Sequence, residues 1–399
     1  MQNKWSIRQK ANAESSERTV GIESLRVMAM LMIITIHYWG GGRAVPEFSG
    51  DWIPLWLVEG FCAGAVNIFA LISGYVMYGK KRSLSKVISL WLEVLIISIF
   101  GLVLQVVFAF DTVSGKCIVQ SFFPFLSGRH WYFSAYIVLF LFIPFLNAVI
   151  ENASWQQASI RILILVGVFS IAPTVSIFIG DPNIYGLNAG FSVNWLAGLY
   201  LVGAYIKKFK NNLIISKLLN NRFLCIMLAM LCGLVILTIL LIVALFQDDF
   251  PLISILWSPA YYRYFTPLVM AQSILIFCSC VDLKPRCEPV NRVFRWMGPL
   301  TFGIYIVHVL PVFEVIILPY LKQWQARNEW LGLIISALDI ILIFLGCTLV
   351  SFAFYKIFGG TIRKTTQWIQ KTIKDLCDIQ NRKNKKYQYQ MRIGEDIRN

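Results

Sequence analysis

The sequence predicts an all-α, polytopic membrane protein of about ten transmembrane helices with both termini in the cytoplasm. Three observations lead to this fold class. Of the 399 residues, 57% are hydrophobic and only 14% are charged, which is too apolar for an ordinary soluble protein. The apolar residues fall in runs of about 20, the length at which a helix crosses a bilayer. The basic residues gather in alternate connecting segments, as the positive-inside rule describes.

The apolar runs place ten spans along the chain. They lie near residues 22–40, 54–78, 87–110, 131–150, 161–179, 190–206, 223–246, 260–281, 298–319 and 331–356. The first run carries Arg26 and lacks a small-residue cleavage site, so we expect a retained helix rather than a signal peptide. We therefore expect a short cytoplasmic segment at 1–21 and one transmembrane domain at 22–356.

The charges of the connections indicate the orientation. With the N-terminus inside, the inside segments hold 29 of the 36 Lys and Arg residues, and the outside loops hold only Arg43, Lys116, Arg129, Lys322 and Arg327. This asymmetry favours an even number of spans with both ends inside. The net charge of +15 is therefore mainly a topology signal. No basic, aromatic segment belongs to a recognisable nucleic-acid-binding module, so no nucleic-acid partner is expected.

Residues 357–399 form a basic cytoplasmic tail. Ile362, Ile369, Ile373 and Leu376 follow helical spacing with basic residues between them. This pattern predicts an amphipathic helix that lies at the membrane interface. Residues 380–399 are polar and basic, and we expect them to be mobile.

Several kinds of chemistry are not expected. The nine cysteines contain no C-x-x-C pair, and only Cys117 falls in an outside loop, so neither a disulfide framework nor a zinc site is predicted. No metal is expected. The chain also has no P-loop, no dinucleotide-binding glycine motif and no nucleophile elbow, which excludes the soluble nucleotide-binding and hydrolase folds.

Arg26 and His37 are the most informative pair in the chain. Eleven residues separate them in the first span, so a helix places both on one face, about 16 Å apart. Ionisable side chains within a membrane helix are costly, and they usually serve a function. For Arg26, a side chain that reaches the inner interface is a competing interpretation.

The chain has three histidines, His37, His130 and His308, and the span assignment places all of them in the outer half of the membrane. Histidine is the side chain best suited to take and return a proton near neutral pH. This placement indicates chemistry on a molecule outside the cytoplasm or within the bilayer.

Four motifs, namely Arg26 with His37, Ser73-Gly74-Tyr75, Tyr305 with His308, and Arg129-His130-Trp131, together resemble those of the acyltransferase 3 family of integral membrane O-acyltransferases. The first is Arg26, ten intervening residues and His37. The second is an apolar stretch that ends in Ser73-Gly74-Tyr75, where the family usually has Ser-Gly-Phe. The third is a glycine-containing turn followed by Tyr305-Ile306-Val307-His308, and the fourth, weaker one is Arg129-His130-Trp131-Tyr132-Phe133. The resemblance extends over roughly residues 20 to 355.

This resemblance implies the transfer of an acyl group, usually acetyl from cytoplasmic acetyl-CoA, to a hydroxyl of an extracytoplasmic or lipid-linked glycan. It also implies a multi-pass protein of the bacterial plasma membrane. In this interpretation, His37 deprotonates the acceptor hydroxyl or first receives the acyl group itself. Arg26 binds the phosphates of the donor, helped by Lys80 and Arg82.

The other candidates have structural alternatives beside the functional ones. Ser73, Gly74 and Tyr75 would shape the donor site, although small residues in membrane helices usually allow close packing. We expect Arg129, His130, Trp131, Arg263, Tyr305 and His308 to face the acceptor; for those near the interface, an ordinary membrane anchor is the alternative. Glu59, Glu93, Glu314 or Asp339 would orient His37, and the sequence does not choose among these carboxylates.

A different class of protein fits some of the same residues. In a transporter or flippase of a lipid-linked sugar, Arg26, His37 and His308 would line a substrate or proton path. We find no convincing internal repeat of the kind that many transporters have. A glycan polymerase would concentrate its chemistry in long outer loops, and the expected outer loops here are short.

Overall fold

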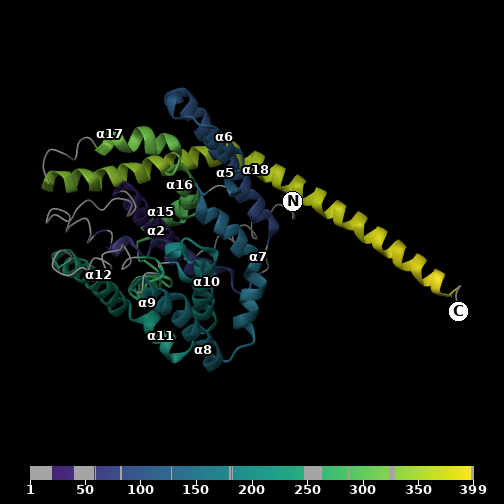
Figure 1. Cartoon of the computed structure of the whole chain (residues 1–399), viewed down its shortest axis with the longest axis horizontal. Helices are drawn as coiled ribbons and strands as arrows, with labels where there is room; N and C mark the ends of the chain where they lie inside the picture. The colour runs from purple at the N-terminus through teal and green to yellow at the C-terminus, as the bar shows by residue number, and fades with distance from the viewer. Residues whose placement is uncertain are drawn as a thin grey trace.

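The computed structural model describes residues 20–39, 58, 60–80, 83–126, 128–178, 181, 183–246, 263–285, 287–322 and 329–396. In these residues all regular secondary structure is helical, which confirms the predicted all-α class. The helices pack into a bundle, and the last helix, α18, continues well beyond it to the C-terminus (Figure 1).

The longer helices form most of the bundle. They are α2 (Val20–Trp39), α4 (Ala65–Met77), α5 (Leu84–Phe108), α7 (Trp131–Glu151), α10 (Val193–Lys208), α12 (Arg222–Phe246), α14 (Pro267–Cys280) and α18 (Glu329–Asp396). The shorter helices are α6 (Gly115–Phe122), α8 (Trp155–Val166), α9 (Ala172–Phe178), α11 (Leu213–Asn220), α15 (Glu288–Met297), α16 (Thr301–Val307) and α17 (Leu318–Lys322).

Within the described ranges, seven helices are long and apolar enough to cross a membrane. An eighth is added if the segments Ile184–Gly190 and Val193–Lys208, which meet at 78°, form one bent span. The predicted span at 260–281 corresponds to α14, which is apolar but has only 14 residues, and residues 247–262 lie outside the described part. The structure therefore supports a multi-span membrane protein, while the number ten stays a prediction.

The predicted ninth span, at 298–319, is not one continuous helix. Helix α16 ends at Val307, and the N–H of Leu310 donates to the Val307 carbonyl (3.2 Å) in a tight turn. Pro311 follows directly, and its ring nitrogen has no hydrogen to continue the helical pattern. A π-helical turn at Phe313–Ile317 then leads into α17. The break falls at His308, at the end of α16.

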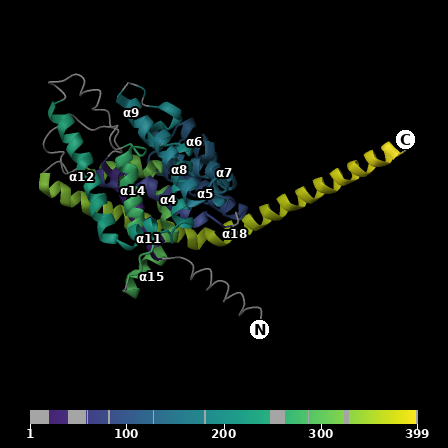
Figure 2. The same ribbon diagram turned by 90° about the horizontal axis from the view of Figure 1, so that it is seen from below.

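The connections that the charge pattern assigned to the inside meet at one end of the bundle. The Lys208 ammonium group donates to the carbonyl of Glu151 (2.9 Å), which joins the ends of α10 and α7. Arg222 donates to the carbonyl of Asp282 (2.8 Å), which joins the connections after α11 and α14. Figure 2 shows α11 and α15 on the same side of the molecule. The structure thus agrees with the prediction that these connections lie at the same end of the bundle.

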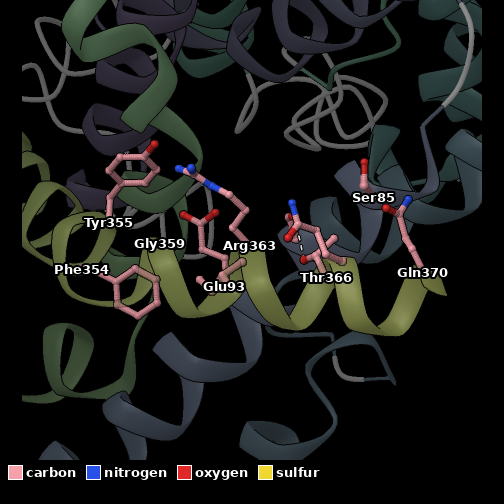
Figure 3. Close-up of a pocket in the computed structure, with 11 residues that line it drawn as sticks. Ser85, Glu93, Phe354, Tyr355, Gly359, Arg363, Thr366 and Gln370 are labelled. Atoms are coloured by element: carbon pink, nitrogen blue, oxygen red, sulfur yellow. Dashed lines mark hydrogen bonds between the residues drawn. The ribbon is translucent and has the colours of Figure 1, made fainter. Parts of the chain in front are cut away.

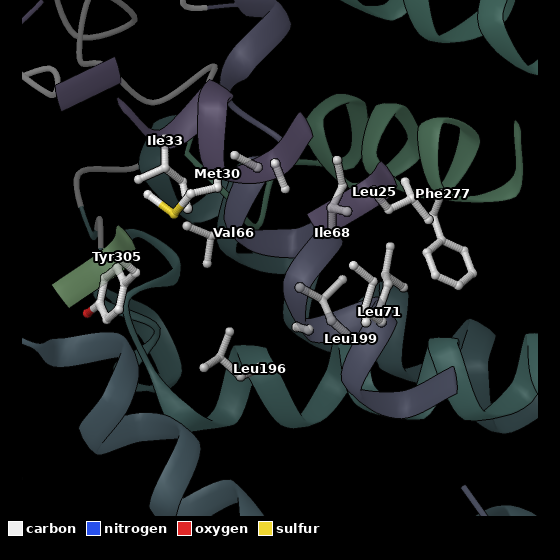
Figure 4. Packing of buried hydrophobic residues seen from close by; sticks show 14 of the residues in the cluster. Leu25, Met30, Ile33, Val66, Ile68, Leu71, Leu196, Leu199, Phe277 and Tyr305 are labelled. Atoms are coloured by element: carbon white, nitrogen blue, oxygen red, sulfur yellow. The ribbon is translucent and has the colours of Figure 1, made fainter. Parts of the chain in front are cut away.

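The centre of the bundle depends on close contact between α4 and α10. A Cβ added to Gly74 would lie 2.0 Å from the carbonyl oxygen of Tyr200, and one added to Gly203 would lie 2.2 Å from that of Leu71. The two backbones can approach this closely only because neither glycine has a side chain. Buried apolar side chains surround this contact, including Leu25, Ile68, Leu71, Leu199 and Phe277 (Figure 4).

Helix α18 unites two predicted segments. Its 68 residues run from the last span through the basic tail without a break, so the expected separate interfacial helix is a direct continuation of the span. Ile362 is buried, and the Thr366 hydroxyl is hydrogen-bonded to that of Ser89 on α5 (3.0 Å). The first part of the tail therefore packs against the bundle. Beyond it, α18 extends as a straight arm (Figures 1 and 2).

Candidate functional site

His37 and His308 meet in space. His37 lies near the end of α2 and is exposed, whereas His308 lies at the break after α16 and is only 2% exposed. Their ring nitrogens, Nδ1 of His37 and Nε2 of His308, are 2.9 Å apart, a hydrogen-bond distance. The two rings are stacked, with centroids 4.9 Å apart. Two of the predicted site histidines therefore act as one unit.

The hydrogen bonds of His308 define how a neutral pair of imidazoles must be protonated. Nδ1 of His308 lies 3.0 Å from the carbonyl oxygen of Ile304, and a carbonyl only accepts, so this nitrogen carries the hydrogen. Nε2 of His308 is then the acceptor, and it receives the hydrogen on Nδ1 of His37. The lone pair of His37 consequently lies on its Nε2. This is the arrangement that a general base requires.

A second contact holds the end of α2 in place. The Tyr38 hydroxyl donates to Oδ2 of Asp339 on α18 (2.6 Å), and both side chains are nearly fully buried. Asp339 is one of the four carboxylates proposed to orient His37, and it binds Tyr38, the residue next to His37. Glu314 is exposed on its π-helical turn, and Glu59 lies outside the described residues.

Arg26 pairs with an acid that the sequence analysis overlooked. Its Nη1 lies 3.0 Å from Oε1 and 3.1 Å from Oε2 of Glu23, which is only 1% exposed. A Cβ added to Gly298 would lie 1.9 Å from Oε2 of Glu23, so the carboxylate fits against a residue with no side chain. The sequence feature that could have predicted this ion pair is the three-residue spacing of Glu23 and Arg26 on one helix. Both bonds to Glu23 use Nη1 of Arg26, so Nε and Nη2 of Arg26 can serve a ligand.

A row of aromatic side chains connects the region of Arg26 with the histidine pair. The charge of Arg26 acts on the hydroxyls of Tyr132 and Tyr136, and the centroids of these two rings are 6.5 Å apart. The ring of Tyr132 lies 6.0 Å from that of Tyr305, which in turn lies 5.9 Å from His308. The row therefore joins the two positions on α2 through α7 and α16.

Polar groups along this row are available for contacts. The hydroxyl of Tyr305 is buried and has no hydrogen-bond partner among the described residues. Ser73 donates to the carbonyl of Phe69 on its own helix (2.9 Å), and its hydroxyl also contacts Tyr132. Ser73 and Tyr305 thus face one region, although they were predicted to bind different substrates. Tyr132 and Tyr136 were missed as site residues, since aromatic residues in a span resemble ordinary lipid-facing ones.

His130 does not lie at an open mouth. It is fully buried, its Nε2 lies 3.2 Å from the Ser98 hydroxyl, and its ring centroid is 6.4 Å from that of Tyr305. Its Nδ1 has no partner among the described residues. The structure thus has His130 at the start of α7, as the span assignment predicts, but enclosed behind Tyr305, and its role toward the acceptor stays a prediction. The cause is packing of the start of α7 against α5 and α16.

The remaining acceptor candidates have contacts of their own. Arg129 is directed towards the thiol of Cys117 (3.8 Å). Trp131 stacks edge-on against Phe191, with centroids 4.8 Å apart. Arg263 is partly buried in the turn before α14, and the residues that precede it lie outside the described part.

The donor candidates have separate environments. Gly74 serves the contact between α4 and α10, which is the packing alternative for a small residue. The ring of Tyr75 lies under the Lys207 ammonium (4.7 Å) and edge-on to Phe277 (5.5 Å). Lys80 is exposed in the turn after α4, and Arg82 lies outside the described residues.

No group of three or more His, Cys, Asp or Glu side chains is placed to hold a metal ion in the described part of the chain.

Comparison with known proteins agrees with this geometry. No curated protein and no solved structure matches the chain. A family model described as an acyltransferase domain, that of the acyltransferase 3 family, matches residues 19–356, which include both α2 and the His308 segment. Because this match covers far more than half of the sequence, the protein belongs to the acyltransferase 3 family and is a membrane acyltransferase.

Proposed function

We propose that this protein transfers an acyl group, most simply acetyl, from cytoplasmic acetyl-CoA to a hydroxyl of an extracytoplasmic or lipid-linked glycan. The observation that carries the proposal is the bond between His37 and His308, which leaves the lone pair of His37 on an exposed ring at the end of α2. An acyltransferase needs such a base to activate a hydroxyl.

The transfer follows directly from this arrangement. Nε2 of His37 takes the proton of the acceptor hydroxyl while the oxygen attacks the thioester carbonyl. The carbon–sulfur bond then breaks, and the CoA thiolate leaves and receives the proton. His308 is a positioning residue, because its Nε2 accepts from His37 and keeps the reactive lone pair on the opposite nitrogen.

Arg26 binds the donor at a distance from the reaction. It is separated from His37 by about 16 Å along α2, so it acts on the phosphates rather than on the thioester. The guanidinium group matches phosphate oxygens, and Glu23 holds it in orientation. The pantetheine arm of CoA would lie along the row formed by Tyr136, Tyr132 and Tyr305, whose hydroxyls can bond to its amides.

The test is acyl transfer by purified protein in lipid nanodiscs. Radiolabelled acetyl-CoA is supplied with envelope glycan or lipid-linked sugar, and succinyl-CoA is compared as a larger donor. We expect label in the glycan, and we expect His37→Ala to lower the turnover by about 10²–10⁴-fold, the usual contribution of a general base. Retention of full turnover in a folded His37→Ala protein would contradict the assigned base.

Arg26→Ala should act differently from His37→Ala. We expect a raised KM for acetyl-CoA, with activity recovered at high donor concentration. Arg295→Ala is the matched control, because it also removes an arginine from an ion pair, here with Glu288 on the exposed helix α15. If the wild type neither binds acetyl-CoA nor transfers label with any envelope fraction, the proposed donor and acceptor are wrong. Transport of a lipid-linked sugar would then be measured.

A further inference from the structure

A cavity lies between α5 and α18, and none of its lining residues belongs to the histidine pair (Figure 3). Its volume is about 370 Å³, and all of its lining residues come from these two helices. The hydrogen bond between Ser89 and Thr366 (3.0 Å) joins the helices within it. At Gly359, no side chain occupies the space. The cavity is therefore a feature of this helix pair alone.

Two opposite charges line this cavity without binding each other. Glu93 extends from α5 and Arg363 from α18, and Figure 3 shows both charged groups on the same side of the cavity. Neither side chain forms a hydrogen bond or an ion pair with another residue in the described part of the chain. Glu93 is half-buried, whereas Arg363 is exposed, and a carboxylate withdrawn from water without a partner is costly. The two groups together match a ligand that carries both a cation and an anion.

Hydroxyl and amide groups provide the rest of the polar lining. Ser85 and Gln370 lie at the end of the cavity away from Tyr355 (Figure 3). They can bond to polar headgroup atoms at the aqueous end of the cavity. Phe354 and Ile362 add an apolar wall. A site with this mixture fits an amphiphile better than a fully water-soluble ion.

The level of the cavity along α18 points to the same class of ligand. Before it, α18 is apolar and includes exposed Leu345, Leu349 and Val350. Lys364 lies at the level of the cavity, and the basic residues Lys371 and Lys374 come after it. Such a change from apolar to basic marks the boundary between hydrocarbon and water, where phospholipid headgroups lie.

We propose that the cavity between α5 and α18 binds the headgroup of a phosphatidylethanolamine-type lipid. The carboxylate of Glu93 accepts hydrogen bonds from the primary ammonium group, and the guanidinium of Arg363 binds the phosphate. A choline headgroup has no N–H to donate, and a glycerol headgroup has no cation. The site therefore distinguishes ethanolamine from both, and it holds a lipid where the last span becomes the arm of α18.

The experiment measures lipid binding to the delipidated, full-length protein by native mass spectrometry in detergent. Phosphatidylethanolamine, phosphatidylcholine and phosphatidylglycerol with identical acyl chains are compared. We expect phosphatidylethanolamine to bind at least about tenfold more tightly than either, the equivalent of one charge-assisted hydrogen bond. Equal binding of the three lipids would overturn the proposal.

Three variants test the assigned contacts. Glu93→Gln should abolish the preference for ethanolamine over choline, and Arg363→Gln should weaken both lipids equally. Lys364→Gln, a neighbouring basic residue that does not line the cavity, is the matched control and should change neither. Preservation of the preference in Glu93→Gln would contradict the assignment. Because Glu93→Gln could fail to fold, Gly359→Leu provides a second test: it favours the helix, fills the cavity and should abolish lipid binding.

Acetyl-CoA supplies the remaining comparison, because it also carries phosphates and amine hydrogens. We expect no displacement of phosphatidylethanolamine by saturating acetyl-CoA. Displacement would assign the cavity to the acyl donor and overturn the lipid proposal. Acyl transfer is measured separately in the same preparations, so failure of lipid binding and failure of the proposed activity can be told apart.

Discussion

At the scale of single residues, the site depends on the direction of one hydrogen bond. Nδ1 of His308 donates to Ile304, so its other nitrogen accepts from His37. The spacing of Arg26 and His37 predicts two functional side chains on one helix face. It says nothing about His308, which reaches His37 only because α16 breaks before Pro311.

This geometry predicts a graded response at position 308. Loss of a hydrogen bond of this kind costs about 1–3 kcal/mol, so His308→Ala should lower kcat by about tenfold to hundredfold with little change in KM for the donor. His308→Gln should recover part of kcat, because its side-chain oxygen can accept the hydrogen on His37. Steady-state kinetics of the three proteins checks this expectation. Equal losses in both variants would indicate a purely structural role for His308.

Cys117 provides a pH-dependent prediction outside the membrane-spanning segments. The Ser114 hydroxyl donates to its thiol (3.3 Å), and this bond, with smaller contributions from Arg129 and Gln105, lowers the pKa of Cys117 from 9.0 to about 7. A lowered pKa means that the reactive thiolate forms at lower pH. The rate of iodoacetamide alkylation should therefore rise through pH 7 rather than through pH 9.

Ser114→Ala is the control for this prediction. It removes the bond that contributes most, so the midpoint of the alkylation profile should move upward. The measurement is the alkylation rate of Cys117 between pH 5.5 and 9.5, followed by mass spectrometry. A midpoint near 9 in the unmodified protein would contradict the assigned hydrogen bonds.

At the scale of helices, the contact between α4 and α10 explains why Gly74 lies where the resemblance placed a donor residue. The missing side chain lets the α4 backbone reach Tyr200. Gly74→Ala and Gly203→Ala should each destabilise the protein by about 1–3 kcal/mol, as expected for overpacking. Gly346→Ala is the matched control: no atom lies within 4 Å of its added Cβ, and the change favours the α18 helix.

Thermal unfolding in detergent distinguishes these three variants. Gly74→Ala and Gly203→Ala should lower the unfolding temperature, and Gly346→Ala should leave it equal or raise it. If Gly74→Ala instead keeps full stability and raises only KM for acetyl-CoA, the donor-binding interpretation of Gly74 would be preferred to the packing one.

The helices were predictable from sequence wherever an apolar run was long and uninterrupted. Helices α2, α5, α7 and α12 correspond closely to the predicted spans, because a membrane leaves the backbone no alternative to internal hydrogen bonds. Breaks were not predictable from hydropathy, since Pro311 lies within an apolar run.

The candidate site was predictable only in part. Arg26 and His37 form a motif within one helix, and the geometry of an α-helix fixes their positions along α2. The pairing of His37 with His308, of Arg26 with Glu23, and of Tyr38 with Asp339 depends on how helices pack or on side-chain rotamers. Sequence spacing restricts contacts within a helix, but it does not choose among partners on different helices. This is why the sequence could not choose among the four carboxylates proposed to orient His37.

At the scale of the whole molecule, the orientation of the bundle can be tested with its own cysteines. The charge pattern predicts that Cys117 faces outside, whereas Cys287 and Cys377 lie in segments that face the cytoplasm. Cys287 and Cys377 are exposed, and Cys117 is partly exposed. In intact cells, a membrane-impermeant maleimide should label Cys117 alone among these three.

The orientation decides whether the proposed reaction crosses the membrane. With this topology, Arg26 lies towards the cytoplasmic end of α2 and His37 towards the outer end, so the donor and acceptor approach from opposite sides. Cys117→Ser should abolish labelling of intact cells, and permeabilisation should expose Cys287 and Cys377. Labelling of Cys287 and Cys377 in intact cells would reverse the orientation. Acetyl-CoA would then have to reach His37 rather than Arg26 first, and the assigned roles of the two ends of α2 would have to be exchanged.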